Sequence, residues 1–340
     1  MKKRRLTAVM IMLVLFLCTF SGCQGRGEWS ADLTGNAINF SLVIRTLQTA
    51  VFIEKANLKA GIEYPESIKE QEKLVSSLMK HLKKNDEIWN SFLLVADDVC
   101  GLLYIDEFYG NKYHDFLVEK LSCYVYEEGL LSIYKKSTEH VPEDAIISSV
   151  QNTAYHLNFL SEALSEEEME RFGFKEAIAY YFNFYLPEAS GMDGDQKDEE
   201  IAEMRGMYSE ILCVLHRLGS ENEVDFTSIQ DLQQQKSRRN FEERYAEDTL
   251  YNASMWAMIA MEEHVYHESN QYDTYANQVF CNLKTEEDFY WNGNPDPFME
   301  LRFYILNGGD VSGNEFYSNH INEWLDEEIM TLYHQMMGNN

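Results

Sequence analysis

The chain of 340 residues carries 57 Asp and Glu against 28 Lys and Arg, which gives a formal net charge of −29 at pH 7. A chain this acidic is not expected to bind nucleic acid, because phosphate contacts require clustered lysines and arginines. Hydrophobic residues make up 45% of the sequence and aromatic residues 13%, which excludes a disordered acidic tail and predicts a packed core.

The first 22 residues have the order of a secretory signal. Four cations at positions 2 to 5 precede an apolar stretch from Leu6 to Phe20, and the small residues Ser21 and Gly22 stand just before Cys23. The stretch is shorter than the ~20 residues that a helix needs to cross a bilayer core. Cleavage is therefore favoured over a permanent transmembrane anchor.

The residues around Cys23 also suggest how the mature chain is attached. Phe20, Ser21, Gly22 and Cys23 resemble the lipobox of bacterial lipoproteins, with Phe20 where that family usually has Leu. The resemblance implies that Cys23 receives a diacylglyceryl group, that the chain is cut immediately before it, and that the lipid bilayer is a partner. The mature protein would then be exported and held on the outer face of the cell membrane, or of the outer membrane if the cell has one. The alternative is an ordinary signal that leaves Cys23 as a free thiol.

Residues 23–36 are polar and glycine-containing, which predicts a short flexible tether. Beyond it, apolar residues recur at helical spacing along almost the whole chain. The most regular stripe runs from Ile201 to Leu218, and residues 253–261 are apolar on every side, which predicts a helix buried all round. Other predicted helices begin near Phe40 and Ile68, run from Trp89 to Leu103, and occupy residues 272–283, 297–306 and 314–337.

The fold class that follows is all-α, with about ten to twelve helices. A chain of this size exceeds what one core usually fills, so we expect two helical bundles or a curved helical array. The polar, glycine-containing segment 191–200 divides an N-terminal helical part, 37–190, from a C-terminal helical part, 191–340. The four cysteines beyond Cys23 are widely separated, which favours free thiols over a disulfide framework.

One candidate metal site lies near the end of a predicted helix. His264, His267 and Glu268 are three and four residues apart, close enough on one helix to share a divalent metal ion. Their order matches neither the zincin motif nor that of di-iron bundles, so the site needs a further ligand, such as His156 or His216. The alternative is a solvated helix end, and no other cofactor is expected.

Asp97 and Asp98 are candidate catalytic residues because they stand in an otherwise apolar stretch. In a helix that continues from Leu94, Asp98 shares a face with apolar side chains, so its carboxylate must be paired, hydrogen-bonded or protonated. Beside a cleft, a raised pKa suits general acid catalysis, with Asp97 or Asp106 as the second carboxylate. The alternative is a helix break near Gly101 that lets either aspartate cap the next turn.

Tyr290 and Trp291 are candidate ligand-binding residues. With Phe289 they stand next to a turn-rich segment, a composition that suits stacking on sugar rings or gripping a peptide. The alternative is that these aromatics fill the core.

Three functions remain open. The first is a non-enzymatic binding or scaffold protein at the cell envelope, with a protein, peptide or glycan as partner. The second is a glycan-active enzyme of α/α-toroid type that uses paired carboxylates. The third is a metal-binding lipoprotein centred on His264 and His267.

Overall fold

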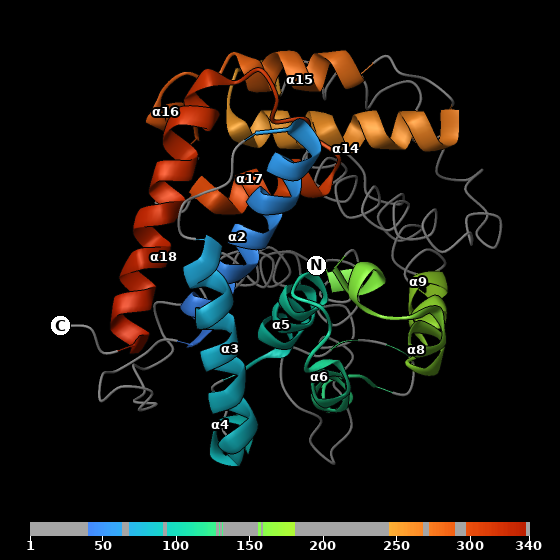
Figure 1. Cartoon of the computed structure of the whole chain (residues 1–340). Coiled ribbons are helices and arrows are strands. Elements are labelled where there is room, and N and C mark those ends of the chain that lie inside the picture. Colours follow the sequence, from blue (N-terminus) through green and yellow to red (C-terminus); the bar gives the residue numbers. More distant parts are fainter. Residues whose placement is uncertain are drawn as a thin grey trace, which may run out of the picture.

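The computed structural model describes residues 40–62, 68–90, 94–126, 129, 131, 156, 157, 159–180, 245–267, 272–289 and 297–337. Within this part of the chain, the only pairing of extended residues is one isolated antiparallel bridge between Val125 and Leu131. The predicted all-α class is confirmed. The helices of Figure 1 are α2 (Phe40–Ala60), α3 (Ile68–Lys84), α4 (Asp86–Asn90), α5 (Ala96–Phe108), α6 (His114–Leu121), α8 (Glu166–Arg171), α9 (Phe174–Tyr180), α14 (Leu250–His267), α15 (Asp273–Cys281), α16 (Glu286–Phe289), α17 (Pro297–Leu306), the π-helix η4 (Tyr317–Ile321) and α18 (Asn322–Met337).

Several predicted features lie outside the described residues. They are the signal segment 1–22, Cys23 and the tether to residue 36, the segment 191–200, the helix 201–218, His216, Glu268, Tyr290 and Trp291.

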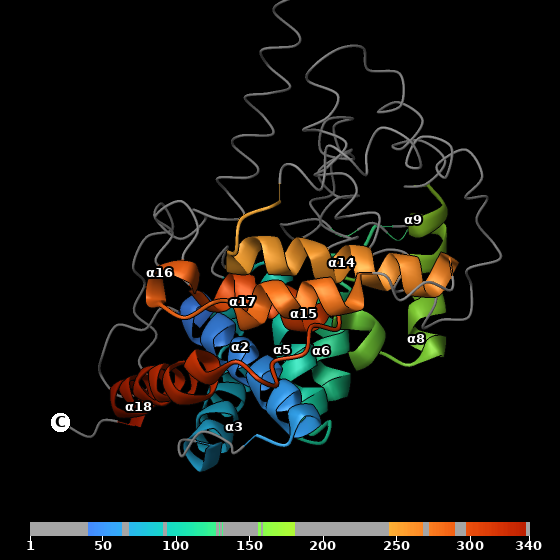
Figure 2. The same cartoon turned by 90° about the horizontal axis from the view of Figure 1, so that it is seen from above.

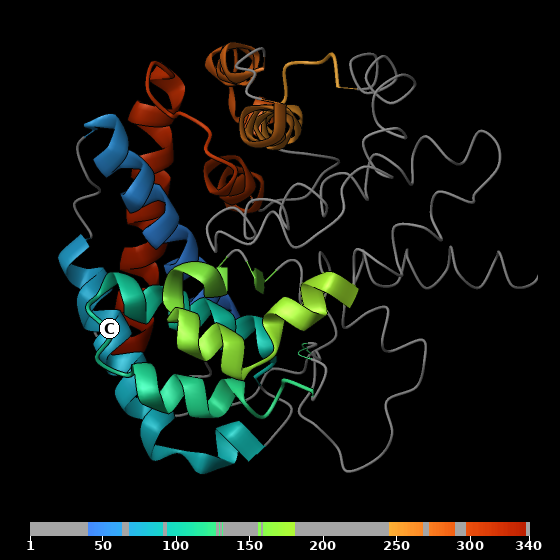
Figure 3. The same ribbon diagram turned by 90° about the vertical axis from the view of Figure 1, so that its right-hand side faces the viewer.

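Helix α2 runs through the middle of the described fold. It contacts α5, α17 and α18, and Figure 3 shows α18 running beside it. Because neighbours surround it on several sides, α2 buries polar as well as apolar side chains, among them Gln48, Glu54 and Asn57. Helices from both predicted parts of the chain thus share one hydrophobic core.

The C-terminal helices stack in layers on α2. Helix α17 lies between α14 and α2, and α15 packs on the far side of α14 (Figure 1). Seen from above, α14 and α15 overlap α17 (Figure 2). The described side chains from Ala253 to Ala260 of α14 are buried, and Met261 is partly buried, so the prediction of a stretch buried all round is confirmed except at its last residue. Trp256 donates its ring N–H to the carbonyl of Tyr245 at 2.9 Å and stacks on Tyr272, so this buried indole has a polar partner.

Helix α17 begins and ends where its sequence indicates. Pro297 fits the first turn because its missing N–H is not needed there. At the other end Gly308 has a φ of 82°, a left-handed conformation that glycine adopts without strain, and its N–H bonds to the carbonyl of Ile305.

The prediction of one continuous helix from Trp89 to Leu103 is wrong, because this stretch is interrupted. Helix α4 ends at Asn90 and α5 begins at Ala96, with Leu94 and Val95 outside any helix. The predicted break near Gly101 is also wrong, because α5 continues through this glycine. Apolar residues on both sides of the real break kept the helical spacing, so periodicity alone could not locate it.

Candidate functional site

Asp98 has a structural role at the start of α5. Its buried carboxylate, 3% exposed, accepts hydrogen bonds from the backbone N–H of Val95 at 2.9 Å and from the hydroxyl of Ser41 at 3.0 Å. A carboxylate in the first turn also interacts favourably with the positive end of the helix dipole. Asp98 therefore stabilises the start of a helix, which was the alternative to a catalytic role. The helix that it caps begins at Ala96, however, and not after a break near Gly101.

Asp97 lies on the other side of the same turn and pairs with a histidine. Its Oδ1 is 2.7 Å from Nε2 of His156, whose side chain is almost completely buried, while the Asp97 side chain is 33% exposed. His156, considered as a distant metal ligand, is thus placed beside a candidate catalytic residue. The two neighbouring carboxylates therefore have different partners: Asp98 bonds to Val95 and Ser41, and Asp97 bonds to His156.

A buried arginine lies close to this pair. Nη1 of Arg302, on α17, donates a hydrogen bond at 2.9 Å to Oε1 of Gln48, on α2. Burial lowers the pKa of Arg302 to about 10, with a smaller contribution from Arg45, while Asp97 opposes the shift. Arg302 therefore stays charged at neutral pH. Gly101 lets α5 approach, since a Cβ there would lie 3.3 Å from Oε1 of Gln48.

Two other titratable groups of α5, Cys100 and Asp106, have environments that disfavour ionisation. Complete burial raises the pKa of the Cys100 thiol, and the charges of Asp97 and Asp98 raise it further. Cys100 therefore stays a thiol and is not an activated nucleophile. Asp106, the other carboxylate considered as a partner, accepts the backbone N–H of Tyr113 at 3.0 Å, and burial raises its pKa.

The candidate metal residues are only partly described. His264 is exposed on α14, whereas the neighbouring Glu263 is buried. His267 ends α14, but its side chain is not among those described. Across the described residues, no group of three or more His, Cys, Asp or Glu side chains is placed to hold a metal ion.

A pocket that the sequence reasoning missed lies at the start of the last long helix. Its volume is about 420 Å³, within the ~300–1,000 Å³ typical of ligand sites. We call it the aromatic–acidic pocket, and it is lined by Phe316, His320, Glu323, Trp324 and Glu327.

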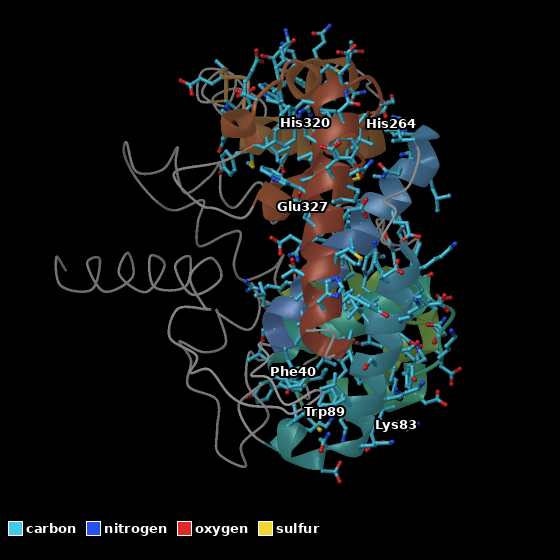
Figure 4. The ribbon with its side chains drawn as sticks, turned by 60° about the vertical axis from the view of Figure 1, so that its left-hand side comes forward. Phe40, Lys83, Trp89, His264, His320 and Glu327 are labelled. Carbon is cyan, nitrogen blue, oxygen red and sulfur yellow. The ribbon has the colours of Figure 1, made fainter. Side chains whose placement is uncertain are left out.

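The spacing of these residues puts them on one face of the helix. On α18, at 3.6 residues per turn, Glu323, Trp324 and Glu327 fall within an arc of roughly 100°, while His320 lies on η4 and Phe316 directly precedes it. The rings of Phe316 and His320 lie parallel, with centroids 4.5 Å apart and planes 5° apart. Figure 4 shows His320 near the start of the last long helix and Glu327 further along it. A search for aromatic and acidic residues at three- and four-residue spacing would have found this face.

Two buried asparagines fix the backbone beneath the pocket. Asn314 accepts the N–H of Tyr317 through Oδ1 at 2.8 Å and donates to the carbonyls of Phe280 and Leu283, which anchors the start of the helix. Asn57, on α2, accepts the hydroxyl of Tyr317 at 2.9 Å and donates to Oδ1 of Asn322 at 3.2 Å. Since Tyr317 is the first residue of η4 and Asn322 follows its last, Asn57 holds both ends of the π-helix.

Phe289, the first residue of the aromatic segment 289–291, packs against one of the residues that line this pocket. Phe289 is buried, as the core-filling alternative expected, and its ring lies 5.2 Å from that of Phe316. Phe289 thus supports the pocket wall from behind. Tyr290 and Trp291, which follow it, lie outside the described residues.

A smaller pocket of about 150 Å³ lies between α2, α5 and the end of α17. Its Lys55 ammonium is already held by Glu107 at 3.0 Å and Glu162 at 2.9 Å, and it lies 4.3 Å from the centre of the Tyr104 ring. Lys59, which is exposed, also lines this pocket. Because the volume of this pocket is smaller than is typical of ligand sites, the aromatic–acidic pocket is the better candidate for an external ligand.

Comparison with protein-family models, curated proteins and solved structures gives no match to this chain. Among the described helices, none combines the length and the apolar character needed to cross a membrane.

Proposed function

We propose that the protein is a lipid-anchored, non-enzymatic binding protein of the bacterial cell envelope, which holds a protein or peptide partner in the aromatic–acidic pocket. The observation that carries the binding role is the pocket itself, with partly buried Phe316 and Trp324 beside exposed Glu323 and Glu327. Rigid aromatic side chains with polar neighbours are typical of protein-binding sites. The anchoring role is supported by the lipobox-like residues that end at Cys23.

Binding is favoured over glycan hydrolysis by the surroundings of the two aspartates. Glycosidases need two carboxylates that face one sugar unit, one of them available as an acid. Asp98 is occupied by Val95 and Ser41, and Asp97 by His156. The carboxylates that suggested an enzyme thus already have partners within the fold.

Replacing Cys23 by alanine is expected to release the protein from the membrane. Two acyl chains give stable anchoring, and the proposal attaches them to the only cysteine next to the cleavage site. Cells grown with radiolabelled palmitate should label the wild-type protein but not Cys23→Ala, and fractionation should move the variant out of the membrane pellet. Cys123→Ala is the matched control and should stay labelled. Equal labelling of both variants would contradict the lipid anchor.

Truncating Trp324 is expected to weaken partner binding at least tenfold without unfolding the protein. An aromatic side chain at the centre of a binding site typically contributes this much. The full chain, purified in detergent, is titrated calorimetrically with a panel of short basic, neutral and acidic peptides. Tyr275→Ala, which truncates an exposed aromatic on α15, is the control and should bind like the wild type. Peptide binding that survives Trp324→Ala would place the partner site elsewhere.

A further inference from the structure

The carboxylates of the aromatic–acidic pocket have no counter-ion in the described part of the chain. The ion pairs found there use other carboxylates, and neither Glu323 nor Glu327 takes part in one. Both side chains are exposed and stand one helical turn apart on α18. Two neighbouring carboxylates repel each other, so an incoming cation relieves this repulsion when it binds.

The protein shows elsewhere how it holds a cation. The Lys55 ammonium is placed between the carboxylates of Glu107 and Glu162 and over the face of the Tyr104 ring. The negative face of an aromatic ring attracts a cation, and this attraction grows when the cation is partly removed from water. Two carboxylates and one aromatic face thus make a lysine site within this chain.

The aromatic–acidic pocket contains the same kinds of group, two carboxylates and aromatic rings, together with His320, and no lysine is among its lining residues. Glu323 and Glu327 supply the two carboxylates, and Trp324, the ring type that binds cations best, lies next to Glu323 with Phe316 in the same lining. Resting on the proposed function, we propose that the pocket takes a lysine or arginine side chain from a basic segment of the partner protein.

The charge of the chain supports a basic partner. At a net charge of −29 the protein attracts cationic segments over a distance and repels acidic ones. An ammonium or guanidinium group also donates N–H bonds to both carboxylates, which a quaternary ammonium group does not. The recognised chemistry is therefore a cation that carries N–H donors.

The test compares acetylated and amidated hexapeptides that differ only at one central residue, which is Lys, Arg, Met or Glu. They are titrated into the full chain by calorimetry at low salt, where electrostatic contacts are least screened. The Lys and Arg peptides should bind at least tenfold more tightly than the Met peptide, and the Glu peptide should not bind. The double variant Glu323→Gln/Glu327→Gln should bind the Lys and Arg peptides at least tenfold more weakly than the wild type does. Its affinity for the Met peptide should be unchanged.

A matched control separates the pocket from the general acidity of the surface. Glu166→Gln/Glu170→Gln removes two exposed carboxylates at the same four-residue spacing on α8, and it should bind like the wild type. Equal loss in both double variants would overturn the proposal in favour of unspecific attraction. Tighter binding of tetramethylammonium than of the basic peptides would overturn it in favour of a quaternary ammonium ligand.

The same titrations distinguish this inference from the proposed function. If the Met peptide binds as tightly as the Lys peptide and Trp324→Ala removes both, the pocket is a binding site but not a cation site. If no peptide binds the wild-type chain, both the cation site and the peptide-binding function are rejected.

Discussion

The Glu54→Gln variant is expected to resist urea better than the wild-type protein at pH 8 and to match it at pH 4. Glu54 lies on α2 with its side chain only 7% exposed, and its Oε2 accepts no hydrogen bond from the described residues. Burial raises the pKa of its carboxyl from 4.5 to about 7. Gln keeps the shape of the side chain and cannot ionise.

The sign of the effect follows from the raised pKa. The neutral carboxyl is the form that the folded protein accepts, so stability from this group is complete below about pH 4.5. It falls as the pH rises towards 7 and then stays low. A difference between 4.5 and about 7 corresponds to ~3 kcal/mol of unfolding free energy at pH 8.

The groups near Glu54 do not reverse this expectation. Tyr109, at the end of α5, donates a hydrogen bond to Gln71 at 3.3 Å; burial raises its pKa, and the charges of Glu54 and Glu72 raise it further. Urea unfolding of both proteins between pH 4 and 8 measures the difference. Glu119→Gln, which changes an exposed glutamate on α6, is the control and should show no pH-dependent gain. A Glu54→Gln gain that is the same at every pH would mean that the folded protein does not disfavour the charged carboxyl.

Phe280→Ala is expected to cost about 3–5 kcal/mol of unfolding free energy, the largest loss that we anticipate for a single substitution. Phe280 is completely buried on α15, and its ring stacks on Tyr304 with centroids 4.2 Å apart. It also meets Phe289 and Tyr317 edge to face. Alanine would leave a cavity and remove three aromatic contacts, each of which contributes beyond the buried area.

Urea unfolding at pH 6 measures this loss as well. Phe280→Leu keeps most of the buried volume and should lose less than half as much, which keeps the comparison measurable if the alanine variant fails to fold. Leu58→Ala, at a position that is 58% exposed on α2, should change stability by less than ~0.5 kcal/mol. A loss below 1 kcal/mol for Phe280→Ala would show that the aromatic cluster does not support the fold.

Local signals in the sequence were enough to predict the all-α class and some of its helix ends. Helix α17 was placed correctly from Pro297 to Leu306 because proline and two glycines limit it on both sides. The buried surroundings of α14 followed from apolar residues on every face of its central stretch. These features depend on residues that are close together in the sequence, so they can be predicted from one sequence alone.

The arrangement of the candidate site could not be predicted in the same way. The π-helix beneath the pocket is held by Asn57, which lies 260 residues before Tyr317, and no local pattern connects the two. The pairing of Asp97 with His156 likewise joins residues that were considered for different roles. Side chains that meet across a core reveal their roles only when the helices are packed.

The hydrogen bonds of α2 also have a consequence for the order in which the protein folds. Gln48 meets Arg302 across 254 residues, and Asn57 meets Asn322 across 265. Contacts so distant along the chain form late, because a long loop must close before they contribute any free energy. A ribosome has therefore made most of the polypeptide before α2 finds these partners, and the growing chain stays open for longer than one whose neighbouring helices pair in sequence. Such a delay is compatible with the export that we propose, because an exported chain is threaded through a membrane before it folds.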